Sequence, residues 1–225
     1  MRSHFELDPG AYGAQRAGHL QEARIALIED ELDGEKARGE LVVDIGCGPG
    51  DVVARLAEDR PDLDFVGLDI DRMMVAHARR AHPGSNLQFD ASMAASVPGA
   101  RARLVYCIDV LHHISDLQKF LGEMATLLVP RGLFVAIEPN IRNPYIWLHQ
   151  ERMRRRGLDE DHFRGAEFER DLAATGRFEA ASHRTAFLVP GAFPPLPVAV
   201  TWIERKLERI PVLGGSVVYR ARLSL

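Results

Sequence analysis

The sequence has little of what marks several large protein classes. Only two cysteines occur among its 225 residues, so no disulfide framework is predicted and a reduced, cytoplasmic protein is expected. No apolar run approaches the roughly 20 residues of a membrane-spanning helix, and charged residues near the N-terminus interrupt any signal-peptide core. We therefore expect no integral membrane contact.

An excess of basic residues is also missing. The chain has 28 Lys and Arg residues against 32 Asp and Glu residues, a net charge of −4. Because a nucleic-acid-binding protein needs a basic face, this balance argues against a nucleic-acid partner. The arginines at 152 and 154–156 are flanked by acidic residues, which favours a solvated helix face. Neither cysteine has a C-x-x-C partner and the histidines are scattered, so no metal site is predicted.

What the sequence does contain is a glycine-rich turn after an apolar run. Residues 41–45 read LVVDI, and Gly46, Gly48 and Gly50 follow at alternate positions before a helical pattern begins. A buried strand that ends in such a turn lets a ligand approach the backbone. A dinucleotide site would place glycine at position 51, where Asp51 would instead repel a phosphate at the helix N-terminus. A ligand without phosphate is therefore favoured.

Strands and helices are expected to alternate along the middle of the chain. Strands are predicted at 41–45, 64–69, 86–89, 103–108 and 132–138, and helices at 50–59, 72–81 and 116–128. This alternation implies a parallel sheet covered on both faces, with ligands bound at the carboxyl ends of its strands. Further helices are predicted at 19–32, 144–157 and 166–175, and further strands at 178–188 and 215–223.

Five motifs resemble, in order, those of class I S-adenosylmethionine (SAM)-dependent methyltransferases, of the small-molecule type 11/12 kind. They are VVDIGCGPG (42–50), VGLDID (66–71), LQFDAS (87–92), VYCIDVLHHI (105–114) and LLVPRGLFVAIEP (127–139). The resemblance implies an α/β fold, a seven-stranded, doubly wound, Rossmann-like sheet whose last strand is antiparallel. One departure is Arg131, where the family usually has glycine.

The resemblance also implies the organisation of the chain. A single methyltransferase domain would span 1–225, with an N-terminal lid and helix at 1–35 and a SAM-binding core at 40–140. The C-terminal part, 141–225, would carry an acceptor-side insertion at 187–211. The implied cofactor is SAM, the product S-adenosylhomocysteine, and no metal is required.

Cofactor contacts are implied at the ends of the strands. Asp44 would organise the glycine turn near the methionine end, Asp69 would take the ribose hydroxyls, and Asp90 would face the adenine amino group. The other residues implied to line the cofactor are Gly46, Cys47, Gly48, Gly50, Ile70, Ala91, Cys107 and Ile108. For the three acids, a loop cap or a solvated strand end is the alternative.

Two adjacent histidines are the candidate catalytic residues. Methyl transfer from a sulfonium is an in-line displacement, so positioning the two reactants supplies much of the catalysis. His112 and His113 follow the fourth predicted strand, where the acceptor should approach, and histidine removes protons well near neutral pH. Adjacent residues cannot both face one pocket, so one base is expected, with His113 preferred. Alternatively, a histidine packs against the helix that begins near Asp116.

Four more residues are candidates for binding the acceptor. Glu138 and Asn140 would either hydrogen-bond a polar acceptor or build the turn after the fifth strand. Tyr12 would close over the site from the N-terminal arm, with Arg16 pairing with the methionine carboxylate. Trp202 belongs to the apolar insertion, which would either cap a hydrophobic acceptor or pack on the sheet or a second subunit. Monomer and homodimer both stay open.

The fourth motif bears on the acceptor. It lacks the Asn/Asp-Pro-Pro-Tyr/Phe signature of methyltransferases that act on amino nitrogens of DNA or on protein glutamine. A small-molecule acceptor is therefore favoured, with a hydroxyl ahead of carbon or nitrogen because a histidine base suits a hydroxyl. The alternatives are a carbon or nitrogen methyltransferase of a metabolite, a SAM-binding protein without transferase activity and, more distantly, a Rossmann oxidoreductase.

Overall fold

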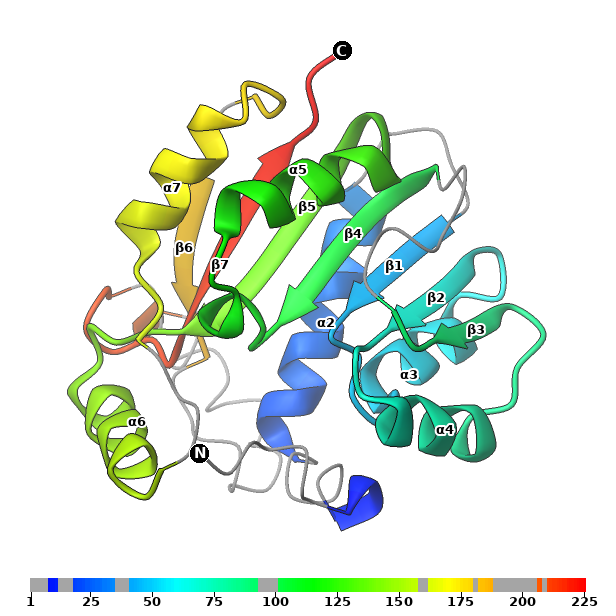
Figure 1. Ribbon diagram of the computed structural model, residues 1–225, viewed down its shortest axis with the longest axis horizontal. Coiled ribbons are helices and arrows are strands. Elements are labelled where there is room, and N and C mark those ends of the chain that lie inside the picture. The colour runs from blue at the N-terminus through cyan, green and yellow to red at the C-terminus, as the bar shows by residue number, and fades with distance from the viewer. Residues whose placement is uncertain are drawn as a thin grey trace.

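The computed structural model describes residues 8–11, 18–34, 41–92, 101–157, 162–179, 182–187, 206–207 and 210–225. Within them, one seven-stranded sheet runs in the order β3-β2-β1-β4-β5-β7-β6 (Figure 1). The strands are β1 (Leu41–Ile45), β2 (Asp64–Leu68), β3 (Leu87–Asp90), β4 (Ala102–Ile108), β5 (Leu128–Pro139), β6 (Ser182–Ala186) and β7 (Ser216–Arg222). The principal helices are α2 (His19–Gly34), α3 (Asp51–Asp59), α4 (Arg72–Ala81), α5 (Leu117–Leu127), α6 (Pro144–Arg155) and α7 (Gly165–Ala174), with a short 3-10 turn, η3 (Leu111–His113).

The direction of the strands confirms the predicted fold class. Strands β1 to β5 pair in parallel, and β7 is antiparallel to both β5 and β6. The strand order reverses direction at β1 and β4, whose carboxyl ends lie side by side. A reversal of this kind is where open α/β sheets bind their ligands.

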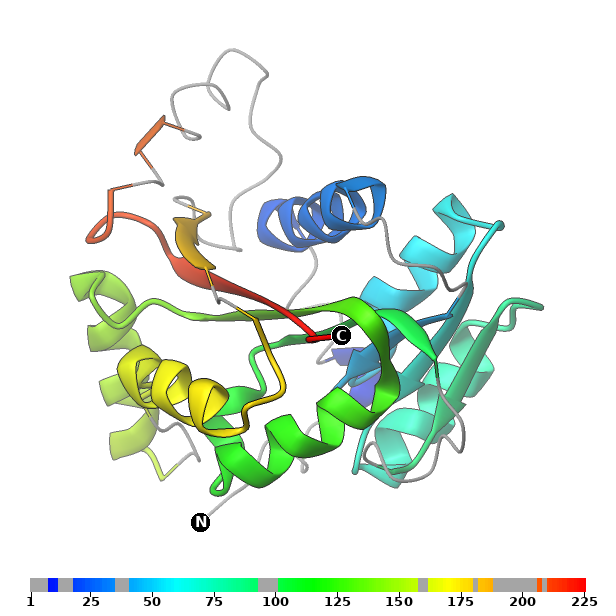
Figure 2. The same cartoon turned by 90° about the horizontal axis from the view of Figure 1, so that it is seen from above.

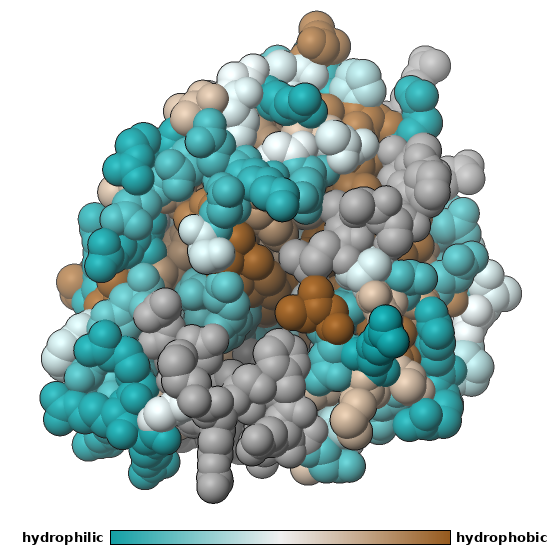
Figure 3. All heavy atoms as spheres, viewed as in Figure 1, coloured by the Kyte–Doolittle hydropathy of each residue, from teal (hydrophilic) through white to brown (hydrophobic). Residues whose placement is uncertain are grey.

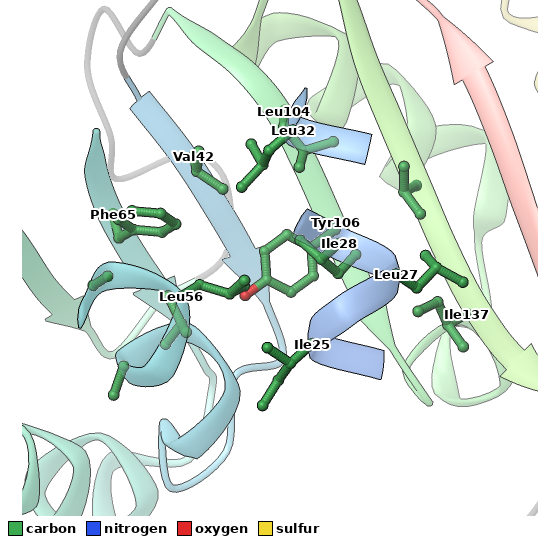
Figure 4. Close-up of a cluster of buried hydrophobic side chains, with 14 of the residues drawn as sticks. Ile25, Leu27, Ile28, Leu32, Val42, Leu56, Phe65, Leu104, Tyr106 and Ile137 are labelled. Carbon is green, nitrogen blue, oxygen red and sulfur yellow. The ribbon is translucent and has the colours of Figure 1, made fainter. Parts of the chain in front are cut away.

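Each central strand sends alternate side chains into two separate cores. On β4, Tyr106 belongs to the cluster packed by α2 and α3, and Cys107 to the cluster packed by α5 and α7. Figure 2 shows the two helix layers on opposite faces of the sheet. In the first cluster, Leu27 and Ile28 of α2 lie over Tyr106 and Ile137 (Figure 4).

The face of the sheet that α5 and α7 cover is the one turned to the viewer in Figure 3. The outer surface of its helices is mainly hydrophilic, and hydrophobic side chains show through below α5, over the sheet (Figure 3). This pattern agrees with the sequence of α5, whose buried residues Phe120, Leu121 and Met124 follow helical spacing.

Side-chain caps fix where three helices begin. Asp71, Asp116 and Asn143 precede α4, α5 and α6, and each accepts a hydrogen bond from a backbone N–H of its first helical turn. Pro144 adds a second start signal in α6, because it occupies the first helical position. Asp116 thus caps α5, as its place before the predicted helix suggested.

Two predicted strands differ most in length from the observed ones. Strand β5 begins at Leu128 rather than residue 132, because Leu128 pairs with Ala102 before the turn at Arg131. Arg131 has a φ of 65°, in the left-handed region that glycine adopts most easily. This conformation explains why the family usually has glycine at this position. Strand β6 covers 182–186 of the predicted 178–188, and Phe178 makes an isolated bridge to Leu223, just beyond β7. Most of the insertion lies outside the described residues.

Candidate active site

The glycine turn after β1 is held by main-chain hydrogen bonds. The N–H groups of Gly46 and Cys47 both donate to the carbonyl of Leu68 at the end of β2, at 2.7 and 3.0 Å. The N–H of Gly50 donates to the carbonyl of Cys47 at 3.0 Å. Gly46, Gly48 and Gly50 have φ values of 73°, 55° and 88°, which glycine adopts without strain.

Close packing also requires two of these glycines. A Cβ on Gly46 would collide with the side chain of Val110, and one on Gly50 would lie 2.7 Å from the ring of Phe89. The same ring would lie 2.7 Å from a Cβ on Gly67 of β2. Sequence analysis did not single out Gly67, although a glycine inside a strand signals a close approach. The turn is therefore shaped by its protein neighbours as well as by any ligand.

Asp69 is buried at the carboxyl end of β2. Its Oδ2 accepts a hydrogen bond from Gly48 N and its Oδ1 one from Asp71 N, both at 2.8 Å. Burial raises the pKa of Asp69, and these two hydrogen bonds oppose the shift. Since each carboxylate oxygen has a further lone pair, the fixed carboxylate suits a ribose diol.

Asp44 is buried at the carboxyl end of β1. Burial raises the pKa of its carboxyl group to about 8; the Tyr106 hydroxyl opposes this shift and the charge of Asp69 adds to it. A positively charged ligand beside the group would favour the ionised form. SAM carries a sulfonium and an ammonium group and no phosphate, so these two carboxylates fit it.

The remaining predicted cofactor residues differ in exposure. Ile70, Asp90 and Ala91 are exposed at the edge formed by β2 and β3, and Asp90 Oδ2 lies 3.9 Å from Arg79 Nη2. Cys47 and Ile108 are half-buried. Cys107 is fully buried in the core under α5, so only its backbone can face a ligand. Their cofactor contacts stay predictions.

Glu138 is 0% exposed and reaches from the end of β5 to the loop after β4. Its Oε1 accepts hydrogen bonds from Val110 N at 2.9 Å and Leu111 N at 2.7 Å. Its Oε2 lies 2.7 Å from Nδ1 of His112. Glu138 thus holds this loop, which neither alternative of the sequence analysis described, and its contact with an acceptor stays a prediction.

The two histidines differ in their surroundings. The His112 side chain is 3% exposed and paired with Glu138, whereas His113 is exposed. The centroids of the two rings lie 4.0 Å apart. The backbone N–H of His113 donates to the carbonyl of Val110, the residue before η3. The structure therefore brings His112, and not the preferred His113, to a buried carboxylate.

Asn140 is buried and hydrogen-bonded to main-chain atoms. Its Nδ2 donates to the carbonyls of Pro211 at 2.8 Å and Gly214 at 2.7 Å. Its Oδ1 accepts from Arg142 N at 3.1 Å. Both amide hydrogens are used in this way, so the turn-building alternative accounts for this side chain.

Three predicted residues, Tyr12, Arg16 and Trp202, lie outside the described residues.

One buried ion pair escaped the sequence analysis. Arg24 of α2 donates through Nη2 to Oδ2 of Asp109 at 2.7 Å, and the two side chains are 10% and 11% exposed. Asp109 directly follows β4 and has a φ of 57°. The sequence did contain a signal that Arg24 is buried. Arg24 stands four residues from both Leu20 and Ile28 and therefore shares their apolar helix face.

The described residues contain neither a candidate metal cluster nor a membrane-spanning helix. No group of three or more His, Cys, Asp or Glu side chains in this part of the chain is placed to hold a metal ion. Across the same ranges, none of the helices has the length and apolar character needed to cross a membrane.

The sheet reversal, the glycine turn and the buried acid after β2 together define a doubly wound α/β domain with a candidate ligand site at the reversal. A family model described as a methyltransferase domain matches residues 43–134. A trans-aconitate 2-methyltransferase of Methylobacterium radiotolerans is 36% identical over 46% of this chain and 40% of that protein. A ubiquinone biosynthesis O-methyltransferase of a Methylobacterium species is 32% identical over 49% of this chain and 45% of that protein.

Solved structures agree with the fold. A putative methyltransferase from Haloferax volcanii, in complex with the Trm112 methyltransferase activator, superposes with a TM-score of 0.66 at 19% identity and covers 96% of both chains. The match spans less than half the length of the two curated relatives. By the match of the family model, residues 43–134 are similar to a methyltransferase domain.

Proposed function

We propose that this protein transfers a methyl group from SAM to a small-molecule acceptor and releases S-adenosylhomocysteine. The observation that carries the proposal is the buried Asp69 carboxylate, tied to the glycine turn through Gly48 N at 2.8 Å. It lies about 20 residues after the glycine turn, the distance at which nucleoside-binding folds place the acid for the ribose. The match of residues 43–134 to a methyltransferase domain supports the choice of SAM over a dinucleotide.

Three acidic residues would bind different parts of SAM. Asp69 would hold the ribose, Asp44 would face the charged methionine end, and Asp90 would meet the adenine. When bound, SAM supplies the activated methyl group, so the protein has to orient the acceptor and exclude water. No metal is proposed for this reaction.

A hydroxyl of a biosynthetic or hydrophobic metabolite is the proposed acceptor group. The names of two relatives, trans-aconitate 2-methyltransferase and ubiquinone biosynthesis O-methyltransferase, support a small molecule, and the second supports oxygen. The mildly acidic net charge of −4 disfavours nucleic acid. A histidine after β4 would take the hydroxyl proton.

The test is an acceptor screen with SAM labelled in its methyl group. The panel holds phenols, catechols, polycarboxylates including trans-aconitate, and primary amines, and transfer is followed by mass spectrometry. Methylation of a phenol or catechol supports the proposal, whereas methylation of a carboxylate supports a small-molecule acceptor but corrects the acceptor group. Methylation of amines alone corrects the acceptor atom, and SAM binding without transfer to any compound favours a binding protein. NADH binding in place of SAM would overturn the assignment.

A further inference from the structure

We propose that Glu138 is a positioning residue that keeps the proton of neutral His112 on Nδ1, so that Nε2 of His112 is the atom that accepts the hydroxyl proton. The second half of this inference rests on the proposed function. The first half concerns the protein alone, and it depends on the hydrogen bonds of a single buried carboxylate.

Glu138 has a defined orientation. Its Oε1 accepts two backbone hydrogen bonds, from Val110 N at 2.9 Å and Leu111 N at 2.7 Å, so that oxygen is fixed toward the loop. Its Oε2 is then left to face His112 Nδ1 at 2.7 Å. The side chain is 0% exposed, so water does not compete for these contacts.

The orientation of Glu138 determines the tautomer of His112. An ionised carboxylate only accepts hydrogen bonds, so Nδ1 of His112 has to be the donor. The proton of the neutral ring therefore resides on Nδ1, and Nε2 carries the lone pair. The same arrangement stabilises the imidazolium after a second proton arrives, because its positive charge lies beside Glu138.

The proton transfer follows from this tautomer. As the bond from the acceptor oxygen to the methyl carbon forms, the methyl–sulfur bond breaks and its electron pair stays on the sulfur of S-adenosylhomocysteine. The hydroxyl proton passes to Nε2 of His112, and the resulting imidazolium later loses it to water.

The isosteric variant Glu138→Gln should change the tautomer of His112. Its amide oxygen would accept the two N–H groups of Val110 and Leu111, which leaves the amide NH₂ facing Nδ1. Because that group donates, Nδ1 must become the acceptor and the proton must move to Nε2. A histidine base with the wrong tautomer loses activity although its position is unchanged, as known for the Asp-to-Asn change in a serine protease triad.

The experiment is nitrogen NMR of the full chain labelled with ¹⁵N-histidine, without SAM or acceptor, at a pH where the ring is neutral. His112→Gln identifies the signals of His112. We expect the proton on Nδ1 in the wild type and on Nε2 in Glu138→Gln. Glu31→Gln is the matched control, because Glu31 is another buried glutamate, paired with Arg220 at 2.7 Å. It should leave the His112 tautomer unchanged.

Several outcomes overturn the inference. A wild-type His112 with its proton on Nε2 does so without any variant, which covers the case that Glu138→Gln fails to fold. An unchanged tautomer in folded Glu138→Gln, or the same change in Glu31→Gln, also does so. None of these readings depends on methyl transfer, so failure of the proposed function is detected separately.

An activity measurement tests the second half. For a phenol or catechol of the panel that the wild type methylates, Glu138→Gln and His112→Gln should each lower kcat by about 100-fold or more, within the usual range for a general base. SAM affinity measured by calorimetry should stay unchanged in both. Near-wild-type turnover in either folded variant contradicts the role of His112.

Discussion

Asp44 and Asp69 are buried carboxylates at the ends of neighbouring strands. They differ in the groups that hydrogen-bond to them. Asp69 accepts hydrogen bonds from two backbone N–H groups, at 2.8 Å each. Asp44 has the Tyr106 hydroxyl beside it, and its burial raises its pKa to about 8. The two carboxylates therefore give separate, measurable predictions.

The first prediction concerns pH and Asp44. Because its pKa rises from 3.8 to about 8 on folding, the ligand-free folded state holds this proton more tightly than the unfolded chain does. Its contribution to stability is complete below about pH 4 and is lost as the pH rises toward 8. Between pH 5 and 8 the wild type should lose on the order of 3 kcal/mol more unfolding free energy than Asp44→Asn. Urea denaturation across this range measures it, and equal slopes for both proteins would contradict the prediction.

The second prediction concerns cofactor affinity and Asp69. Asp69→Ala removes a buried, charged acceptor for two hydroxyls, so SAM binding should weaken by roughly 10- to 100-fold. Asp64→Ala is the control, because Asp64 is an exposed aspartate at the opposite end of the same strand. Calorimetric titration should show unchanged affinity for that variant. Equal affinities of folded Asp69→Ala and wild type would remove Asp69 from the site.

At the scale of elements, an ion pair joins α2 to the end of β4. Arg24 and Asp109 meet at 2.7 Å with both side chains largely buried, whereas Arg55 and Asp59 of α3 meet at 2.6 Å with both side chains much more exposed. Nearly equal distances thus occur in two very different environments. This contrast makes the two pairs a matched comparison.

The third prediction follows from that contrast. Arg24→Met should lower the free energy of unfolding by about 3 kcal/mol, because it removes the positive charge that is paired with the largely buried Asp109 carboxylate. Arg55→Met should cause no measurable change, since solvent screens that pair. Chemical denaturation compares the two variants at one pH. A larger loss in Arg55→Met would show that burial does not decide the importance of these pairs.

The fourth prediction concerns the turn that leads into the body of β5. Arg131 holds a φ of 65°, which is costly for any residue with a side chain. Arg131→Gly removes that strain, but glycine also increases the conformational entropy of the unfolded chain, which offsets part of the stabilisation. The free energy of unfolding should therefore rise by roughly 0.5–1 kcal/mol. Arg131→Ala keeps the strain and should not stabilise. Thermal denaturation of the three proteins separates these results.

At the scale of the whole molecule, ligand binding should stabilise the folded chain. SAM and S-adenosylhomocysteine at 100 times their dissociation constants should each add about 2.7 kcal/mol, seen as a rise in Tm. NADH at the same concentration should give no shift, since Asp51 stands at the N-terminus of α3, where a dinucleotide would place its pyrophosphate. This is the fifth prediction. A Tm shift with NADH and none with SAM would contradict it.

Much of the fold was predictable because its signals are local. Val42 and Val43 of β1 enter opposite cores, as alternation along a strand requires. The start of α6 was readable from Asn143 and Pro144, because capping acts within one helical turn. The true start of β5 at Leu128 was not, since it depends on pairing with Ala102 on another strand.

Taken by itself, the sequence determined the alternating fold, the glycine turn and the acids at the strand ends, because periodicity and spacing are properties of neighbouring residues. Only the tertiary structure decided that Glu138 meets His112, that Asn140 is occupied by main-chain carbonyls and that Arg24 pairs with Asp109. The physical reason is common to all three. Each contact joins residues 26 or more positions apart, which meet only when separate elements reach the same edge of the sheet.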